Sequence, residues 1–275
     1  IRDRLELAGP AWKRLPLVSP LLGTAAPLKG TLQLSGASFK PKLSLAMAQA
    51  SNPLLQSWSL QAGWTAQSGL LKLEQFRSPD LSARGRLPLR LGPGGLKLGS
   101  LEADLRLDSY PLERLGPLLG TEMDGTIAAS GRVFGPLDAL QPDLRLALNH
   151  PRAGALRLTE DWSGSFLGRP GGGGVLSMAS VGSVIAGSLE ARLGPNWLPT
   201  DVMLRRRNGD LQLSGTPAAY QWTASNLSVD GLEIVLPPRQ RWEGVYGRLS
   251  GNGTLALQPL AMTGDLSISL SLIHI

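Results

Sequence analysis

The sequence predicts an all-β protein, an antiparallel repeat sheet accompanied by a few short helices. Three observations lead to this prediction. Leucines alternate with polar residues at a period of two over most of the chain, which is the pattern of strands with one buried face. The 275 residues include 34 glycines and 21 prolines beside 42% hydrophobic residues, a composition typical of many turns between short strands. A seven-residue motif also recurs, which indicates a repeat architecture.

The motif, Gly-[Thr/Asp]-[Leu/Ile]-x-x-Ser-Gly, occupies Gly30–Gly36, Gly125–Gly131 and Gly209–Gly215, and a looser copy ends at Gly251. The first two copies follow the same five residues, Pro-Leu-Leu-Gly-Thr. Repeats of this kind stack by covering one another's apolar faces. We therefore predict a first β-repeat unit at 1–110, a second at 111–236 and the start of a third at 237–275, as parts of one continuous body rather than independent domains.

Each predicted strand is marked by apolar residues at alternate positions, and turn-forming residues separate it from the next strand. In chain order the marking residues are Leu32 and Leu34; Leu43, Leu45 and Met47; Leu60, Ala62, Trp64 and Ala66; Leu71 and Leu73; Leu87, Leu89 and Leu91; Leu96 and Leu98; Leu101, Ala103, Leu105 and Leu107; Ile127 and Ala129; Leu144, Leu146 and Leu148; Leu156 and Leu158; Leu176 and Met178; Leu189, Ala191 and Leu193; Val202 and Leu204; Leu211 and Leu213; Trp222 and Ala224; Leu227 and Val229; Leu232, Ile234 and Leu236; Leu255 and Leu257; and Leu266, Ile268 and Leu270. The regular period predicts antiparallel strands joined by short turns.

Two segments depart from strand spacing. Three prolines limit the segment around Val18–Leu22 to a turn of helix, and leucines at helical spacing predict another short helix within Tyr110–Gly120. The strongest hairpin signal is Asn208–Gly209, because a type I′ turn requires positive φ at both central residues.

The basic charge favours an anionic lipid or nucleic-acid partner only weakly, and the aromatic residues argue against nucleic acid. The net charge is +6. The chain has no cysteine, and this absence excludes disulfides, thiol nucleophiles and cysteine metal sites. Most cations are arginines at polar positions, a pattern typical of a solvated strand face. Trp58, Trp64 and Trp162 are not interleaved with basic residues, as platforms for stacking bases would be.

The sequence offers little for catalysis. Only His150 and His274 could supply imidazoles, too few for a histidine triad or a metal cluster. No nucleophile elbow, phosphate-binding loop or zinc-protease motif occurs in the sequence. We predict that the protein is not an enzyme and uses no cofactor or metal.

Charged clusters are expected on solvated surfaces. Glu160, Asp161 and Glu190 come nearest to a pair of catalytic carboxylates, but carboxylates on the wet face of a sheet are far commoner. Arg205–Arg207 stand beside the predicted hairpin turn, where a solvated rim is the expected role.

The strand series leaves one apolar face to be covered. Each leucine left in water forgoes about 1.5–3 kcal/mol of burial, and two short helices cannot cover so many strands. Either the sheet curls on itself or an apolar ligand such as lipid occupies the face.

One order of elements occurs at Leu28–Leu45 and Met123–Leu148, and more loosely at Tyr246–Leu257: a Pro-Leu-rich segment, then [Leu/Met]-x-Gly-x-[Leu/Ile]-x-x-x-Gly, a turn, and a Pro-x-Leu-x-Leu strand. This order resembles the TamB and AsmA-like family of bacterial envelope proteins, although the first copy lacks the Gly-Pro-Leu turn that the second has at Gly135–Leu137. The resemblance implies an elongated sheet curled into an apolar groove (a β-taco) that crosses the periplasm from an inner-membrane anchor and carries phospholipid toward the outer membrane.

On this resemblance we expect a middle fragment of a non-enzymatic lipid conduit that supports outer-membrane assembly. Its partners would be phospholipid acyl chains and an outer-membrane β-barrel protein, the latter through a C-terminal region outside this chain. The expected groove lining is Leu32, Leu34, Leu43, Leu45, Leu101, Leu105, Leu107, Ile127, Leu144, Leu146, Leu211, Leu213, Leu255 and Leu257. The alternative is a structural β-sandwich or β-solenoid segment of a surface protein or adhesin, in which the same leucines form a dry core and bind no lipid.

Overall fold

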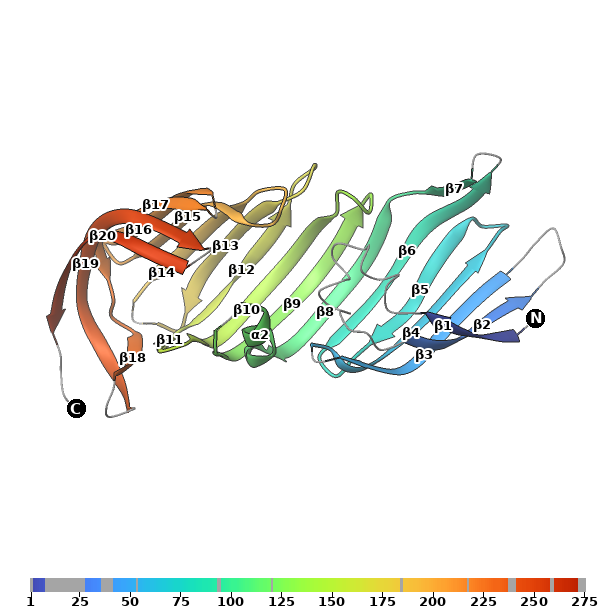
Figure 1. Cartoon of the computed structure of the whole chain (residues 1–275), viewed down its shortest axis with the longest axis horizontal. Helices are drawn as coiled ribbons and strands as arrows, with labels where there is room; N and C mark the ends of the chain where they lie inside the picture. Colours follow the sequence, from blue (N-terminus) through green and yellow to red (C-terminus); the bar gives the residue numbers. More distant parts are fainter. Residues whose placement is uncertain are drawn as a thin grey trace. The chain divides into compact units, whose positions relative to one another are not determined.

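A computed structural model describes residues 2–7, 28–35, 42–52, 54–92, 95–119, 121–183, 185–216, 218–236, 241–257 and 260–271. In these residues the protein is all-β, as predicted, and every strand pair with a described register is antiparallel (Figure 1). The chain divides into two compact units: unit 1 comprises Ile1–Tyr110 with Ala129–Leu140, and unit 2 comprises Pro111–Ala128 with Gln141–Ile275.

Unit 1 is a ladder of strands paired in sequence order. Its strands are β1 (Arg2–Leu7), β2 (Leu28–Ser35), β3 (Lys42–Asn52), β4 (Gln56–Thr65), β5 (Leu70–Arg77), β6 (Leu81–Gly92), β7 (Gly95–Leu98) and β8 (Leu101–Pro111), with the later half of β9 (Met123–Gly135). Each of β1 to β5 pairs with the next strand, and β6 pairs with both β7 and β8.

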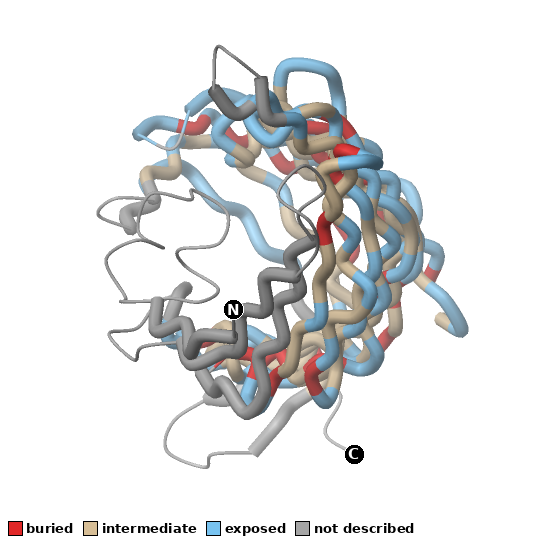
Figure 2. The backbone as a smooth tube through the Cα atoms, turned by 90° about the vertical axis from the view of Figure 1, so that its right-hand side faces the viewer, coloured by how far each residue is buried: buried red, intermediate tan, exposed pale blue. Residues whose placement is uncertain are grey.

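The two faces of the unit 1 sheet differ in polarity. Register places Leu71 opposite Leu87, and Leu105 opposite Ala83. On the other face Arg86 and Glu102, which are also opposite one another, form an exposed ion pair at 2.5 Å. Half-buried leucines therefore alternate with exposed charges along β8. Figure 2, coloured by burial, shows intermediate and exposed stretches alternating along the backbone.

Unit 2 contains a ring of strands. Besides the first half of β9, its strands are β10 (Gln141–Ala153), β11 (Leu156–Leu158), β12 (Asp161–Gly168), β13 (Gly174–Val181), β14 (Gly187–Leu193), β15 (Pro199–Arg206), β16 (Gly209–Thr216), β17 (Ala219–Ser228), β18 (Leu232–Leu236), β19 (Arg241–Leu257) and β20 (Leu260–Ser271). Pairing runs from β10 through β12 to β17 in order, on to β19 and β18, and returns through β11 to β10. Ten strands are thus joined in a closed circuit.

The closed circuit corrects the prediction of a sheet that stays open as a groove. Closure occurs because β10 and β19 are long strands that pair with different partners along their length. β10 pairs with β12 at 143–148 and with β11 at 152–153, and β19 pairs with β17 at 248–255 and with β18 at 241–245. The short strands β11 and β18 then pair with each other and complete the ring.

The predicted hairpin is present, but its turn lies one residue earlier than expected. Arg206 pairs with Gly209, so Arg207 and Asn208 are the central residues, and Arg207 has a φ of 51°. This register sets Val202 opposite Leu213 and Leu204 opposite Leu211. A turn centred on Asn208 and Gly209 would instead have set Arg206 opposite Leu211. The observed register forms these two apolar pairs, whereas the alternative would form one, Leu204 with Leu213, so apolar pairing favours the observed turn.

The short helix expected within Tyr110–Gly120 is confirmed as a 3-10 turn, η2 (Leu112–Leu115), followed by one turn of α-helix, α2 (Gly116–Leu119). The segment expected around Val18–Leu22 lies outside the described residues. Among the residues that the structure describes, no helix is long and apolar enough to cross a membrane.

We predict that Gly164→Ala destabilises unit 2 by about 1–3 kcal/mol. Gly164 of β12 lies where two strands approach closely, and an added methyl group would overlap the carbonyl oxygen of Ser177. In the control Gly244→Ala, the new methyl would be 3.5 Å from the ring of Tyr246, an ordinary contact, and we expect a change below about 0.5 kcal/mol. Denaturant unfolding measures both. Equal losses from the two variants would contradict this account of β12.

Candidate functional site

Two paths of unequal length join β10 to β19 in unit 2. The short path runs through β11 and β18, which we call the flap; the long path runs through β12 to β17, which we call the arch. With neighbouring strands about 4.8 Å apart, three steps span roughly 14 Å and seven steps roughly 34 Å. The arch therefore bows away from the flap and has a concave face.

The contacts of Arg206 identify which face is concave. Arg206 ends β15 in the middle of the arch, yet its side chain contacts Glu160, which follows β11, and Asp230, which precedes β18. Neither residue lies on a strand adjacent to β15, so the contacts cross the inside of the ring. Val202 and Leu204 lie on the same face of β15 as Arg206, because side chains alternate along a strand.

Two apolar rows cross this concave face. Members of a row lie directly opposite one another on successive strands from β10 to β17. The first row is Leu144, Phe166, Leu176, Ala191, Val202, Leu213 and Trp222, and the second is Leu146, Gly164, Met178, Leu189, Leu204, Leu211 and Ala224. Cross-strand contacts along each row make the apolar surface continuous over seven strands.

The rows are only partly covered. Ala191, Trp222 and Ala224 are buried, whereas the leucines of both rows are half-buried. In the packed interior of a sandwich, leucines in such central positions are fully buried as a rule. The convex face carries exposed polar residues between them, such as Gln212 and Thr223.

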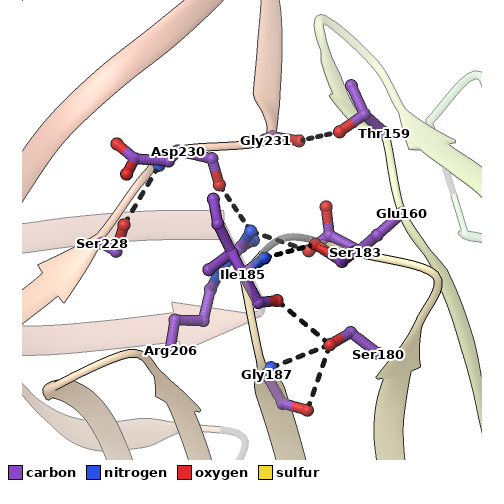
Figure 3. A network of polar contacts seen from close by, with 10 residues as sticks. All are labelled: Thr159, Glu160, Ser180, Ser183, Ile185, Gly187, Arg206, Ser228, Asp230 and Gly231. Atoms are coloured by element: carbon purple, nitrogen blue, oxygen red, sulfur yellow. Dashed lines mark hydrogen bonds and ion pairs between the residues drawn. The ribbon is translucent and has the colours of Figure 1, made fainter.

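A cluster of polar contacts surrounds Arg206 at the end of β15 (Figure 3). Nη2 of Arg206 lies 2.7 Å from Oε1 of Glu160 and donates a hydrogen bond of 2.5 Å to the carbonyl oxygen of Asp230. Nη1 of Arg207 lies 3.0 Å from Oδ2 of Asp230, and the backbone N–H of Thr159 donates to the carbonyl oxygen of Gly231 at 3.0 Å. The cluster ties the arch to both halves of the flap.

The central ion pair is almost fully removed from water. The side chains of Arg206 and Glu160 are 4% and 2% exposed. Their 2.7 Å contact is not aligned as a hydrogen bond, and among the described residues neither carboxylate oxygen of Glu160 nor Nε of Arg206 has a hydrogen-bond partner. Burying two charges costs several kcal/mol per ion, and incomplete hydrogen bonding leaves much of that cost unrecovered. The pair holds the end in place without making it strongly stable.

Serine hydroxyls brace the arch next to this pair. Oγ of Ser180 accepts a hydrogen bond from the backbone N–H of Gly187 at 2.8 Å and donates to the carbonyl oxygen of Ile185 at 3.2 Å. Oγ of Ser183 accepts from the N–H of Ile185 at 3.0 Å. These bonds hold Ile185 and Gly187 to the two serines, and Figure 3 draws them in one view with the polar cluster.

At the far end of β17, Tyr220 anchors the arch. Its side chain is fully buried, and its hydroxyl donates a 2.7 Å hydrogen bond to the carbonyl oxygen of Pro199. Burial raises the pKa of the Tyr220 phenol, since the charged form loses hydration.

The predicted lining residues fall into three groups. On the concave side of unit 2 lie Leu144, Leu146, Leu211 and Leu213, with Leu255 opposite Tyr220 on the same face. Half-buried in β8 or β9 are Leu101, Leu105, Leu107 and Ile127. The backbones of Leu32, Leu34, Leu43, Leu45 and Leu257 lie in described strands, but their side chains lie outside the described ones. That any of these residues contacts lipid stays a prediction.

Glu160 and Arg206 correct the expectation of solvated charges, whereas Asp161, Glu190 and the remaining two arginines lie at half-buried or exposed positions. The alternation along the chain could have indicated these buried charges. Arg206 is two positions from Leu204, and Glu160 is two positions from the buried Trp162. Strand periodicity therefore assigns Arg206 to the inward face, whereas Glu160 lies in the bend before β12 and its inward position follows from its contact with Arg206.

Unit 1 has a hollow of a different kind. A pocket of about 390 Å³ lies at the ends of β5, β6 and β8 and is lined by charges of both signs, among them Arg77, Arg84, Asp104 and Arg106. These side chains are exposed, and the lining has no continuous apolar row. Within the described part of the chain, no group of three or more His, Cys, Asp or Glu residues could hold a metal ion.

A scan against protein-family models found no match, and searches of curated proteins and of solved structures found none either.

We predict that Arg206→Met lowers the free energy of unfolding by about 3–5 kcal/mol, because it leaves the Glu160 carboxylate buried without a counter-charge. Adding Glu160→Gln to this variant should recover part of the loss, with a coupling of about 1–3 kcal/mol in a double-mutant cycle.

The matched control is Arg86→Met, which breaks an ion pair between side chains that are 62% and 58% exposed. We expect this variant to lose less than about 1 kcal/mol. If chemical denaturation gave similar losses for Arg86→Met and Arg206→Met, the buried pair would not be the tie that holds the arch to the flap.

Proposed function

We propose that this protein is a non-enzymatic conduit for the acyl chains of phospholipids, with the two apolar rows of the arch as the contact surface. The observation that carries the proposal is the pair of uninterrupted rows, whose leucines keep part of their surface accessible on a concave face. A surface of this kind suits a long hydrocarbon chain, which needs continuous apolar contact and no specific hydrogen bonds.

The energetics favour such a surface. A lipid crossing water exposes about sixteen methylenes per chain at about 0.8 kcal/mol each, so a two-chain lipid faces a penalty on the order of 25 kcal/mol. Continuous leucine contact removes much of this penalty at every point along the path. No reacting group is needed, because the process makes and breaks no covalent bond.

The resemblance to TamB and AsmA-like proteins is part of the same proposal. It implies a periplasmic setting between the inner and outer membranes, with support of outer-membrane assembly and a barrel protein there as partner. Because the strands of unit 2 form a closed circuit, an acyl chain must reach the concave face either at an end of the ring or through a break in the strand pairing.

We predict that purified protein carries phospholipid and that Leu146→Asp reduces the bound amount about tenfold. The substitution places a charge in the second row, and losing one leucine contact of about 1.5–3 kcal/mol corresponds to a tenfold or larger loss of affinity. Mass spectrometry of extracted lipids gives the bound amount per protein.

The control is Leu167→Asp on β12, the strand that pairs with β10. Leu167 is 50% exposed on the convex face, so the same charge should leave lipid content unchanged. Lipid that is absent from the wild-type protein would favour the alternative, a structural β-segment without lipid binding. Equal lipid loss in both variants would point to general destabilisation and away from the rows.

A further inference from the structure

The contact between β11 and β18 is the shortest link of the ring between strands that no hairpin joins. It consists of three residue pairs: Leu156 with Ile234, Arg157 with Glu233, and Leu158 with Leu232. The other two such links, β10 with β12 and β17 with β19, contain six and seven pairs. We call the three-pair contact the seam.

Polar contacts hold much of the seam. Arg157 and Glu233 form a hydrogen-bonded ion pair across it, and their side chains remain 37% and 25% exposed. The hydroxyl and the backbone N–H of Thr159 both donate to the carbonyl oxygen of Gly231. Leu156 is 51% exposed. Water can replace these hydrogen bonds, and little apolar surface is uncovered when they break.

Arg206 reinforces the seam from both sides. It contacts Glu160, just beyond β11, and Asp230, just before β18, so one arch side chain holds the two strands together (Figure 3). When the seam separates, water can reach the buried carboxylate of Glu160 and the guanidinium of Arg206. Their recovered hydration offsets part of the loss of the ion pair.

We propose that the ring opens at the seam and that acyl chains reach the concave face through this opening. The proposal rests on the proposed function of the apolar rows. Opening anywhere within the arch would break at least six residue pairs and divide both apolar rows, whereas opening the seam breaks three pairs and leaves both rows intact. Local opening follows segments with few buried apolar contacts, and among the links that no hairpin joins the seam has the fewest residue pairs.

A disulfide across the seam tests the proposal. The chain has no native cysteine, so the variant Leu156→Cys/Ile234→Cys contains one possible disulfide, between residues directly opposite on antiparallel strands. The matched control, Leu167→Cys/Val175→Cys, joins opposite residues of β12 and β13, and Leu167 is 50% exposed, like Leu156.

The measurement is the rate at which each variant takes up a phospholipid with a fluorescent acyl chain from phosphatidylcholine vesicles, before and after reduction by a dithiol. Oxidation should slow uptake by the seam variant at least about tenfold, since it removes the competent open state, and reduction should restore the rate. The control should load at the same rate in both redox states.

The possible negative results distinguish the entry route from lipid binding itself. If the oxidised seam variant loads as fast as its reduced form, the seam is not the way in, while lipid binding itself stands. If no form of the protein takes up lipid, the proposed function fails and the seam proposal fails with it. Hydrogen exchange on the unmodified protein is an independent check: amides of β11 and β18 should exchange before those of β13 to β16, and the reverse order would overturn the proposal.

Discussion

Cross-strand register is the constraint on which the structure of unit 2 depends. Each strand of the arch places its small and apolar side chains opposite those of the next strand, so rows that begin at Leu144 and Leu146 continue without a polar interruption to Trp222 and Ala224. A slip of one residue in any pairing would turn one strand's apolar residues to the convex face and break both rows. Glycine maintains the spacing where backbones approach most closely, as at Gly164.

Ring closure and the polar cluster follow from this register. Because β10 and β19 have partners at different heights, a short path and a long path join the same two strands, and the long one must bow. The bow brings the end of β15 back toward the flap, where Arg206 meets Glu160 and Asp230. Apolar contact thus builds the concave surface, while charge holds its end. Water replaces polar contacts more readily than apolar ones. The arch, held by apolar rows, should therefore stay closed, whereas the seam, held by polar contacts, is suited to opening.

Much of this could be predicted from the sequence. The period of two indicated the strands and their faces, and the proline-bounded leucines indicated the short helix at Leu112–Leu119. Other features depended on contacts remote in sequence. Ring closure rests on Leu156–Leu158, a strand that the alternation predicted, but its pairing with residues more than seventy positions later left no local signal in the sequence. The turn beside Arg206 slipped by one residue because pairing Val202 with Leu213 outweighed the local preference of Asn208–Gly209. The inward position of Arg206 could be predicted because it lies two positions from Leu204 on the same strand, but its ion-pair partner Glu160 could not.

The central claim is that an acyl chain contacts the concave face of the arch, and mapping of contacts by photo-cross-linking tests it most directly. A fatty acid with a photoreactive group midway along its chain would be bound, irradiated and located on the protein by peptide mass spectrometry. The account predicts adducts on row residues such as Leu176, Met178, Leu211 and Leu213. Adducts confined to exposed apolar residues away from that face, such as Leu167 of β12 or Leu266 and Ile268 of β20, would contradict it.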